Sequence, residues 1–165
     1  MKHLTSIFAA VAFVALVNDA AIAQVTATQT VNLSVSAVQL IAVSNSSVTL
    51  SIDGSAAVAG TNGVGSASDN STTYSITHNG AASLRITAAI DAAMPAGTTL
   101  DLALANVGGN GSSAGTVILS STAQDVVTGI AAGVVSGEAI SYTFSADATA
   151  GQFSGSRTVT LTLTN

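Results

Sequence analysis

Residues 25–36 read VTATQTVNLSVS, and apolar side chains hold most odd positions of this stretch while hydroxyl and amide side chains hold the even ones. An alternation with a period of two is typical of a β-strand that turns one face to a core and the other to solvent. The register slips near Ala37, after which Val38, Leu40 and Ala42 continue the apolar series on even positions. Because a slip of one residue moves every side chain to the opposite face, we expect a bulge or a short break there.

Similar short alternating runs continue along the whole chain. The strands that they predict cover residues 48–52, 72–77, 84–90, 100–104, 116–119, 126–130, 140–144 and 159–163. Loops rich in Gly, Ser and Asn separate these runs, chiefly residues 53–71 and 106–115, and His78-Asn79-Gly80 has the composition of a type I′ hairpin turn. The spacing predicts an all-β protein, a single antiparallel β-sandwich of about 8–10 short strands.

The N-terminus has the anatomy of a secretory signal peptide. Lys2 and His3 form a short basic start, residues 7–17 are apolar, and residues 21–23 read AIA, the small-residue pattern of a cleavage site. The apolar run is shorter than the roughly 20 residues that a membrane-spanning helix needs. We therefore predict a signal peptide at 1–23 and a mature β-sandwich domain at 24–165. Such a protein is secreted, extracellular or at the cell surface, without membrane insertion.

Charge is scarce in this chain. Only 7% of its 165 residues are charged, the formal net charge is −5, and there is no cysteine. Beyond the predicted signal peptide there is no lysine, and the cations are Arg85 and Arg157. Nucleic acid and anionic membrane surfaces are disfavoured as partners, because binding to either needs a basic patch. The lack of cysteine excludes disulfide scaffolds, thiol catalysis and cysteine-type zinc sites.

Both ends of the predicted mature chain are strand-like, and either end can pair within its own sandwich or be added to a neighbouring copy. In strand addition, backbone hydrogen bonds supply affinity and alternate side chains fill pockets. Head-to-tail addition does not close on itself and therefore builds filaments. We take residues 24–36 as a candidate donor strand, although an ordinary first strand stays open as the alternative. Its inserted face would be Val25, Ala27, Val31, Leu33 and Val35, and the acceptor groove would include Leu161 and Leu163.

The C-terminal residues 150–161, AGQFSGSRTVTL, resemble the final hairpin of bacterial secreted fimbrial and spore-coat-U-like proteins. Residues 86–102 and 122–129 are similar to small exported β proteins of Gram-negative bacteria. The resemblance implies an immunoglobulin-like sandwich on the cell surface, of a kind often polymerised by an exchanged strand. The chain departs from usher-assembled pilins in lacking the cysteine pair that many of them carry. This difference speaks against a chaperone–usher route and leaves self-assembly by strand exchange open.

Catalytic patterns are weak. Residues 111–115 match G-x-S-x-G, but this motif presents a nucleophile only at a strand-to-helix turn with a histidine base in reach, whereas Ser113 lies in a Gly/Ser-rich loop. His78 is the single histidine of the predicted mature chain, and its place beside Asn79-Gly80 predicts a solvated turn residue. We expect no enzyme and no cofactor.

Metal binding has slightly better support. Asp53, Asp69, Asp125 and Asp147 fall in or near predicted loops, where carboxylates and loop carbonyls could hold Ca²⁺ weakly. Single Asp residues in loops more often form Asx turns, so no metal site is assigned.

The sequence thus favours a structural subunit of an extracellular or cell-surface filament, such as a pilus or a biofilm-matrix fibre, whose partners are identical copies. The alternative is a monomeric secreted surface or adhesin module that binds a ligand through the loops at 53–71 and 106–115. The two differ in concentration dependence, because a filament subunit sediments as large particles and a binding module does not.

Overall fold

The computed structural model describes residues 26–108 and 110–165. The chain divides into two units, with the boundary between Ser34 and Val35. In the first unit, residues 26–34 form neither strand nor helix, and their side chains are exposed. The predicted signal peptide at 1–23 and Val25 lie outside the described residues.

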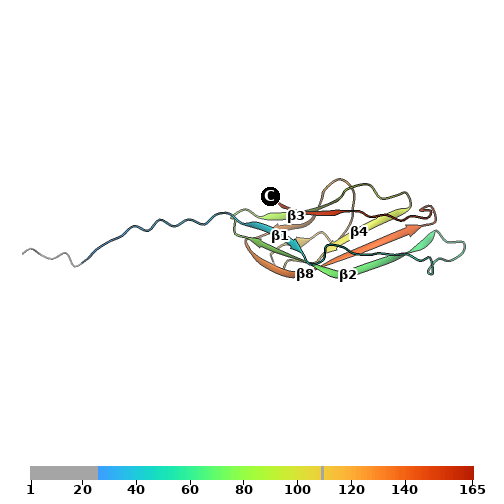
Figure 1. The fold of residues 1–165 in the computed structure, drawn as a ribbon, viewed down its shortest axis with the longest axis horizontal. Coiled ribbons are helices and arrows are strands. Elements are labelled where there is room, and N and C mark those ends of the chain that lie inside the picture. Colours follow the sequence, from blue (N-terminus) through green and yellow to red (C-terminus); the bar gives the residue numbers. More distant parts are fainter. Residues whose placement is uncertain (1–25, 109) are drawn as a thin grey trace, which may run out of the picture. The chain divides into compact units, whose positions relative to one another are not determined.

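The second unit contains nine strands and no helix among its described residues (Figure 1). They are β1 (Gln39–Val43), β2 (Gly63–His78), β3 (Leu84–Ile90), β4 (Thr98–Leu104), β5 (Ser112–Ser113), β6 (Thr116–Ile118), β7 (Gln124–Ile130), β8 (Gly133–Asp147) and β9 (Val159–Thr164).

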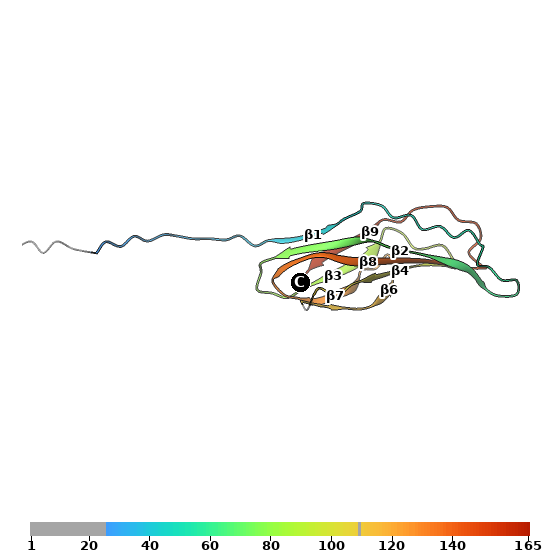
Figure 2. The ribbon, with the colours of Figure 1, turned by 90° about the horizontal axis from the view of Figure 1, so that it is seen from below.

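These strands form two antiparallel sheets with one core between them (Figures 1 and 2). The first sheet has the order β1-β2-β8-β4-β6, and the second has the order β5-β7-β3-β9. Fully buried side chains from both sheets meet in the core, among them Tyr74, Ile76, Leu102 and Ile140 from the first and Leu84, Ile86, Val127 and Ile130 from the second. The prediction of an all-β chain with two packed antiparallel sheets is confirmed.

The alternation in the sequence explains why the central strands form. β3 reads LRITAAI and β4 reads TTLDLAL, and every second residue of each strand is buried. Successive side chains of a strand point to opposite faces, so one face of each strand enters the core and the other stays accessible. Burial of one Leu or Ile contributes about 1.5–3 kcal/mol, so these faces together fix how the strands are oriented.

The predicted hairpin turn at His78-Asn79-Gly80 is wrong. β2 ends at His78 and pairs with β1 and β8, whereas β3 belongs to the other sheet, so the connection crosses between sheets. None of the described residues other than glycine has a positive φ, so Asn79 does not adopt the type I′ geometry.

His78 is correspondingly not a solvated turn residue. Its side chain is only 2% exposed, with Nε2 donating to the carbonyl oxygen of Ala82 at 2.9 Å and Nδ1 accepting from the Gly80 amide at 3.1 Å. The crossing between sheets carries the imidazole inward, where both of its nitrogens bond to the connection itself.

Four other predicted boundaries are corrected. Residues 63–71 of the expected loop at 53–71 belong to β2, and the expected loop at 106–115 contains β5. Residues 48–52 and the described part of the predicted donor strand, residues 26–36, form no strand. A bulge or break near Ala37 is likewise not seen, because among the described residues the first strand begins only at Gln39.

Candidate assembly groove

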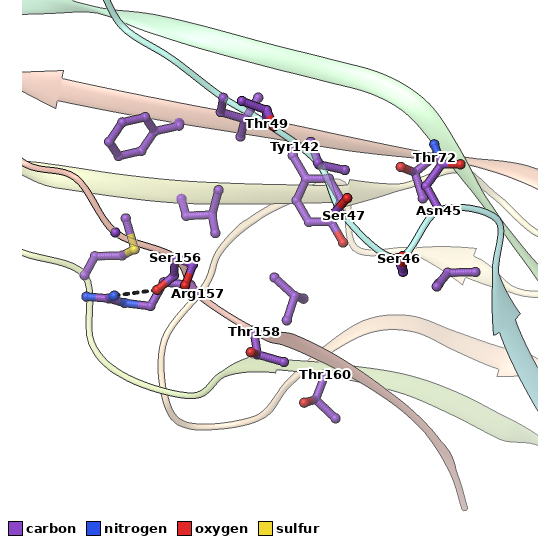
Figure 3. A pocket seen from close by; sticks show the side chains of 18 of the residues that line it. Asn45, Ser46, Ser47, Thr49, Thr72, Tyr142, Ser156, Arg157, Thr158 and Thr160 are labelled. Atoms are coloured by element: carbon purple, nitrogen blue, oxygen red, sulfur yellow. Dashed lines mark hydrogen bonds between the residues drawn. The ribbon is translucent and has the colours of Figure 1, made fainter.

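A groove of about 1020 Å³ lies along the side of the sandwich where the edge strands β1 and β9 approach each other (Figure 3). One wall is formed by residues 41–52, and the other by residues 153–161. The floor consists of Thr72, Met94, Leu100, Tyr142 and Phe144. Burial raises the pKa of the Tyr142 phenol, which agrees with a floor that is partly shielded from water.

The first wall has the side-chain pattern of a strand but no strand partner. Val48, Leu50 and Ile52 are half-buried and alternate with exposed residues. The last backbone contact before them joins the Ser44 amide to the Thr73 carbonyl oxygen at 2.9 Å. Within the described chain, residues 45–52 make no backbone–backbone hydrogen bond. Their amides and carbonyls are therefore free to pair with an added strand.

The second wall consists of a part that precedes β9 and the first residues of β9, which pair with β3. The earlier part, residues 153–157, is held by side chains rather than by backbone pairing. The Arg157 Nη2 and Nε donate to the Ala93 carbonyl oxygen at 2.8 and 3.2 Å, and Nη1 donates to the Ser156 carbonyl oxygen at 2.8 Å. The same guanidinium lies 5.7 Å from the ring centroid of Phe153, within the range of a cation–π contact. Among the described residues, 153–157 make no backbone–backbone hydrogen bond, so this part of the wall is a second unpaired edge.

Thr72 enters the groove because of an irregularity in β2. The register between β2 and β8 shifts between Asp69 and Thr72, and the more buried positions change from odd numbers before the shift to even numbers after it. A β-bulge re-aims side chains in this way. Thr72 is 2% exposed, and within the described part of the chain its Oγ1 has no hydrogen-bond partner. Figure 3 shows Thr72 beside Asn45, toward the opposite end of the groove from Arg157.

The segment that precedes β1 is fixed to the sandwich by one residue, Asn79, through its side chain and its backbone amide. Asn79 Oδ1 accepts from the Val38 amide at 2.7 Å, and Asn79 Nδ2 donates to the Ser36 carbonyl oxygen at 2.9 Å. The Asn79 amide also donates to the Val38 carbonyl oxygen at 3.2 Å. These bonds hold the chain at residues 36–38, so that residues 26–35 lie before the point of attachment.

The predicted donor residues have exposed side chains wherever they are described. Val31 is 66% exposed, and Leu33 and Val35 are each 88% exposed. Ala27 is also exposed, and Val25 lies outside the described residues. Of the two predicted acceptor residues, Leu161 lines the groove, whereas Leu163 packs against the core and does not line it.

Most of the groove was missed by sequence reasoning. The alternation Val48, Leu50, Ile52 was the available signal for the first wall, but it reads as an ordinary paired strand. Arg157 and Phe153 gave no signal beyond their place in a Gly/Ser-rich stretch.

The residues considered for catalysis or metal binding have local structural partners. Ser113 donates through Oγ to the Leu104 carbonyl oxygen at 2.6 Å and accepts from the Gly115 amide at 3.0 Å. Asp125 pairs with Arg85 at 3.4 Å.

Each of the three other candidate calcium ligands accepts a hydrogen bond from the amide two residues later in the chain. Hydrogen bonds from Ser55 lower the pKa of Asp53, and those from Thr149 lower the pKa of Asp147. Asp69 accepts from the Ser71 amide at 3.1 Å. Over the described ranges, the structure brings no three Asp, Glu or His side chains together as a metal site.

Comparison with known proteins gives no assignment. No protein-family model, no curated protein and no solved structure matches the chain. Among the residues described, no helix is long and apolar enough to cross a membrane.

Proposed function

We propose that this chain is a secreted structural subunit that polymerises head to tail into an extracellular filament. Residues 24–36 of one copy add as a strand to the groove of the next copy. The proposal includes removal of the signal peptide at 1–23, an immunoglobulin-like connectivity for the sandwich, and kinship with fimbrial and spore-coat-U-like proteins. The observation that carries it is the presence, in one chain, of a groove between two unpaired edges and of an unpaired segment with the alternation of a strand.

The two walls favour a strand as the occupant. Residues 45–52 and 153–157 make no backbone–backbone hydrogen bonds within the described chain, so an inserted strand can pair on both sides. Strand addition uses such edges for affinity and uses pockets on alternate positions for specificity. A small molecule would leave most of these amides and carbonyls without partners.

The free segment has the side chains that such a groove accepts. Val31, Leu33 and Val35 are largely exposed, and Asn32 and Ser34 between them carry polar groups for the outer face. Full burial of three aliphatic side chains contributes roughly 4.5–9 kcal/mol at about 1.5–3 kcal/mol each. With backbone pairing on both sides, this gain supports a stable contact between copies.

The attachment at Asn79 favours a neighbouring copy over insertion into the same sandwich. A segment that folded back into its own groove would have to reverse direction at residues 36–38, where Ser36 and Val38 are bonded to Asn79. Insertion into the next copy needs no such reversal. Because each copy then gives one strand and receives another, the contact is heterologous and extends into a filament.

Electron microscopy tests the proposal with two chains, one beginning at Gln24 and one beginning at Ala37. We expect filaments from the first and none from the second, although both sandwiches give the same circular dichroism spectrum. A synthetic peptide of residues 24–36 should bind the shorter chain and cap growing filaments. Monodisperse particles from the longer chain at every concentration would overturn the proposal and favour the monomeric adhesin module, with residues 53–62 and 106–115 as its binding loops.

A further inference from the structure

The structure contains a buried hydroxyl in the groove and a single polar residue on the strand face that would cover it. The odd-numbered face of residues 25–35 carries Val, Ala, Val, Leu and Val, with Gln29 as its one polar member. In the groove, Thr72 is 2% exposed and its Oγ1 has no partner among the described residues. An unpaired buried hydroxyl is unfavourable, and so is an amide placed against an apolar floor.

The side chains of the floor follow one another at the spacing of an added strand, and each successive position along the floor is called a level. Thr72 pairs with Ile140 on β8, and Tyr142 and Phe144 follow at intervals of two residues along the same strand. Met94, from the connection between β3 and β4, also lines the groove. Alternate residues of an extended strand are about 6–7 Å apart, so successive inward residues of a donor meet successive levels.

The direction of insertion follows from the two ends of the groove. At the Thr72 end, β1 contacts β9, and Val43 and Leu161 from these two strands line the groove beside it. Away from Thr72, residues 48–52 and 153–157 carry no backbone pairing in the described chain, so that end of the groove is open. A donor strand stays attached to its own sandwich through residues 36–38, so its attached end belongs at the open end of the groove.

Direction and spacing together give one alignment. Leu33 lies at the Phe144 level, Val31 lies at the Tyr142 level, and Val35 follows at the open end. Gln29 then arrives at Thr72, where its side-chain amide can donate to the hydroxyl or accept from it. The donor runs parallel to the wall at 45–52 and antiparallel to β9.

We propose that Gln29 of one copy hydrogen-bonds to Thr72 of the next and that this pair sets the register of the inserted strand. The inference rests on the proposed polymerisation, and it adds the residues that select one alignment. A shift of two residues would place Val31 or Ala27 against Thr72 and leave both the hydroxyl and the Gln29 amide without partners. The pair therefore discriminates among alignments that the aliphatic residues alone would tolerate.

Disulfide trapping tests the register directly, because the chain has no cysteine of its own. The full chain from Gln24 is made with Tyr142→Cys combined in turn with Val31→Cys or Leu33→Cys, and with Asn32→Cys as a control on the opposite face, so that Gln29 and Thr72 stay in place. A disulfide requires Cβ atoms about 3.5–4.5 Å apart, which resolves steps of 6–7 Å. After mild oxidation of assembled filaments, we expect a covalent ladder from the Val31→Cys pair at least tenfold stronger than from the other two. A ladder from the Leu33→Cys pair as strong as that from the Val31→Cys pair, or stronger, would overturn the register while leaving strand addition intact.

A double-mutant cycle gives a second readout that does not depend on cysteine. Thr72→Val should raise the concentration needed for assembly roughly tenfold, the equivalent of one hydrogen bond, and Gln29→Leu in the same chain should restore it. Additive effects of the two changes would refute the pairing. If the unsubstituted chain forms no filaments, the proposed function itself fails, which is a result separate from a wrong register.

Discussion

Leu33→Ala provides the sharpest separation between folding and assembly. In the isolated chain, Leu33 is 88% exposed and lies in a segment without secondary structure, so the sandwich does not depend on it. In the proposed filament, the same side chain is buried at the Phe144 level of the groove. Full burial of a Leu side chain contributes about 1.5–3 kcal/mol. Truncation to Ala should therefore weaken each contact by about 2 kcal/mol, or roughly 30-fold in the concentration needed for assembly.

The assay compares Leu33→Ala with Ser34→Ala, which changes the neighbouring residue on the opposite face of the same segment. The concentration at which large particles appear is measured by sedimentation, and the melting temperature is measured below that concentration. We expect a large shift in assembly for Leu33→Ala, little for Ser34→Ala, and the same melting temperature for both. Equal assembly of the two variants, or a lower melting temperature for Leu33→Ala alone, would refute the burial of Leu33 between copies.

Three further predictions concern the sandwich and its groove. Gly97 and Gly115 both have φ of +75°. A Cβ added at Gly97 would lie 2.5 Å from atoms of the turn at 147–150, whereas a Cβ added at Gly115 would have no atom within 4 Å. In denaturant unfolding we expect the free energy of unfolding to fall by about 1 kcal/mol for Gly115→Ala and by about 3 kcal/mol or more for Gly97→Ala. Burial, and to a smaller extent the charge of Glu138, raise the pKa of Tyr74 from 10.0 to about 12. The stability that the neutral phenol contributes is therefore complete below pH 10 and is lost as the pH rises through 12. Tyr74→Phe should remove this part of the destabilisation at alkaline pH, which is on the order of 2 kcal/mol. In the chain from Gln24, trypsin can cut only after Arg85 and after Arg157. Arg85 lies in β3, which is paired on both sides, whereas Arg157 lies in a segment without backbone pairing in the described chain. We therefore expect mass spectrometry to show cleavage after Arg157 in free subunits and protection of the same bond in filaments.

The alternation in the sequence predicted where side chains are buried better than it predicted how strands pair. β3 and β9 follow their alternating runs closely, because a buried face on every second residue is a local property of the chain. Residues 48–52 show the same alternation and are half-buried in the same way, yet they have no strand partner. Pairing depends on which chain segment lies beside the edge, and that information is not present in the alternating residues themselves.

Nonlocal packing also explains the errors at the turns. His78-Asn79-Gly80 has the composition of a hairpin, but it connects two different sheets because the partners of β2 and β3 lie far away in sequence. The position of Thr72 in the groove depends on a bulge between Asp69 and Thr72, where the local residues Asp69 and Ser71 bond to each other. The more buried residues of β2 have odd numbers up to Asp69 and even numbers from Thr72 onward. Only the pairing with β8 shows where this change occurs and which face Thr72 occupies.

The edge strands differ between the two sides of the sandwich: β5 and β6 form the edges on one side, and β1 and β9 form the edges on the groove side. Edge strands invite pairing with other chains, and proteins usually blunt them by shortening them or by placing charges or proline on them. On one side, the edge strands β5 and β6 have only two and three residues. On the groove side, residues 45–52 and 153–158 hold Arg157 as their one charged residue and contain no proline. The guanidinium of Arg157 donates hydrogen bonds to the carbonyl oxygens of Ala93 and Ser156. It therefore holds residues 153–157 in place rather than projecting from the edge to prevent pairing. One side of the sandwich thus ends in short edge strands, while the other presents longer segments with a single charge and with residues 45–52 and 153–157 unpaired in the described chain, which is the asymmetry that head-to-tail strand addition requires.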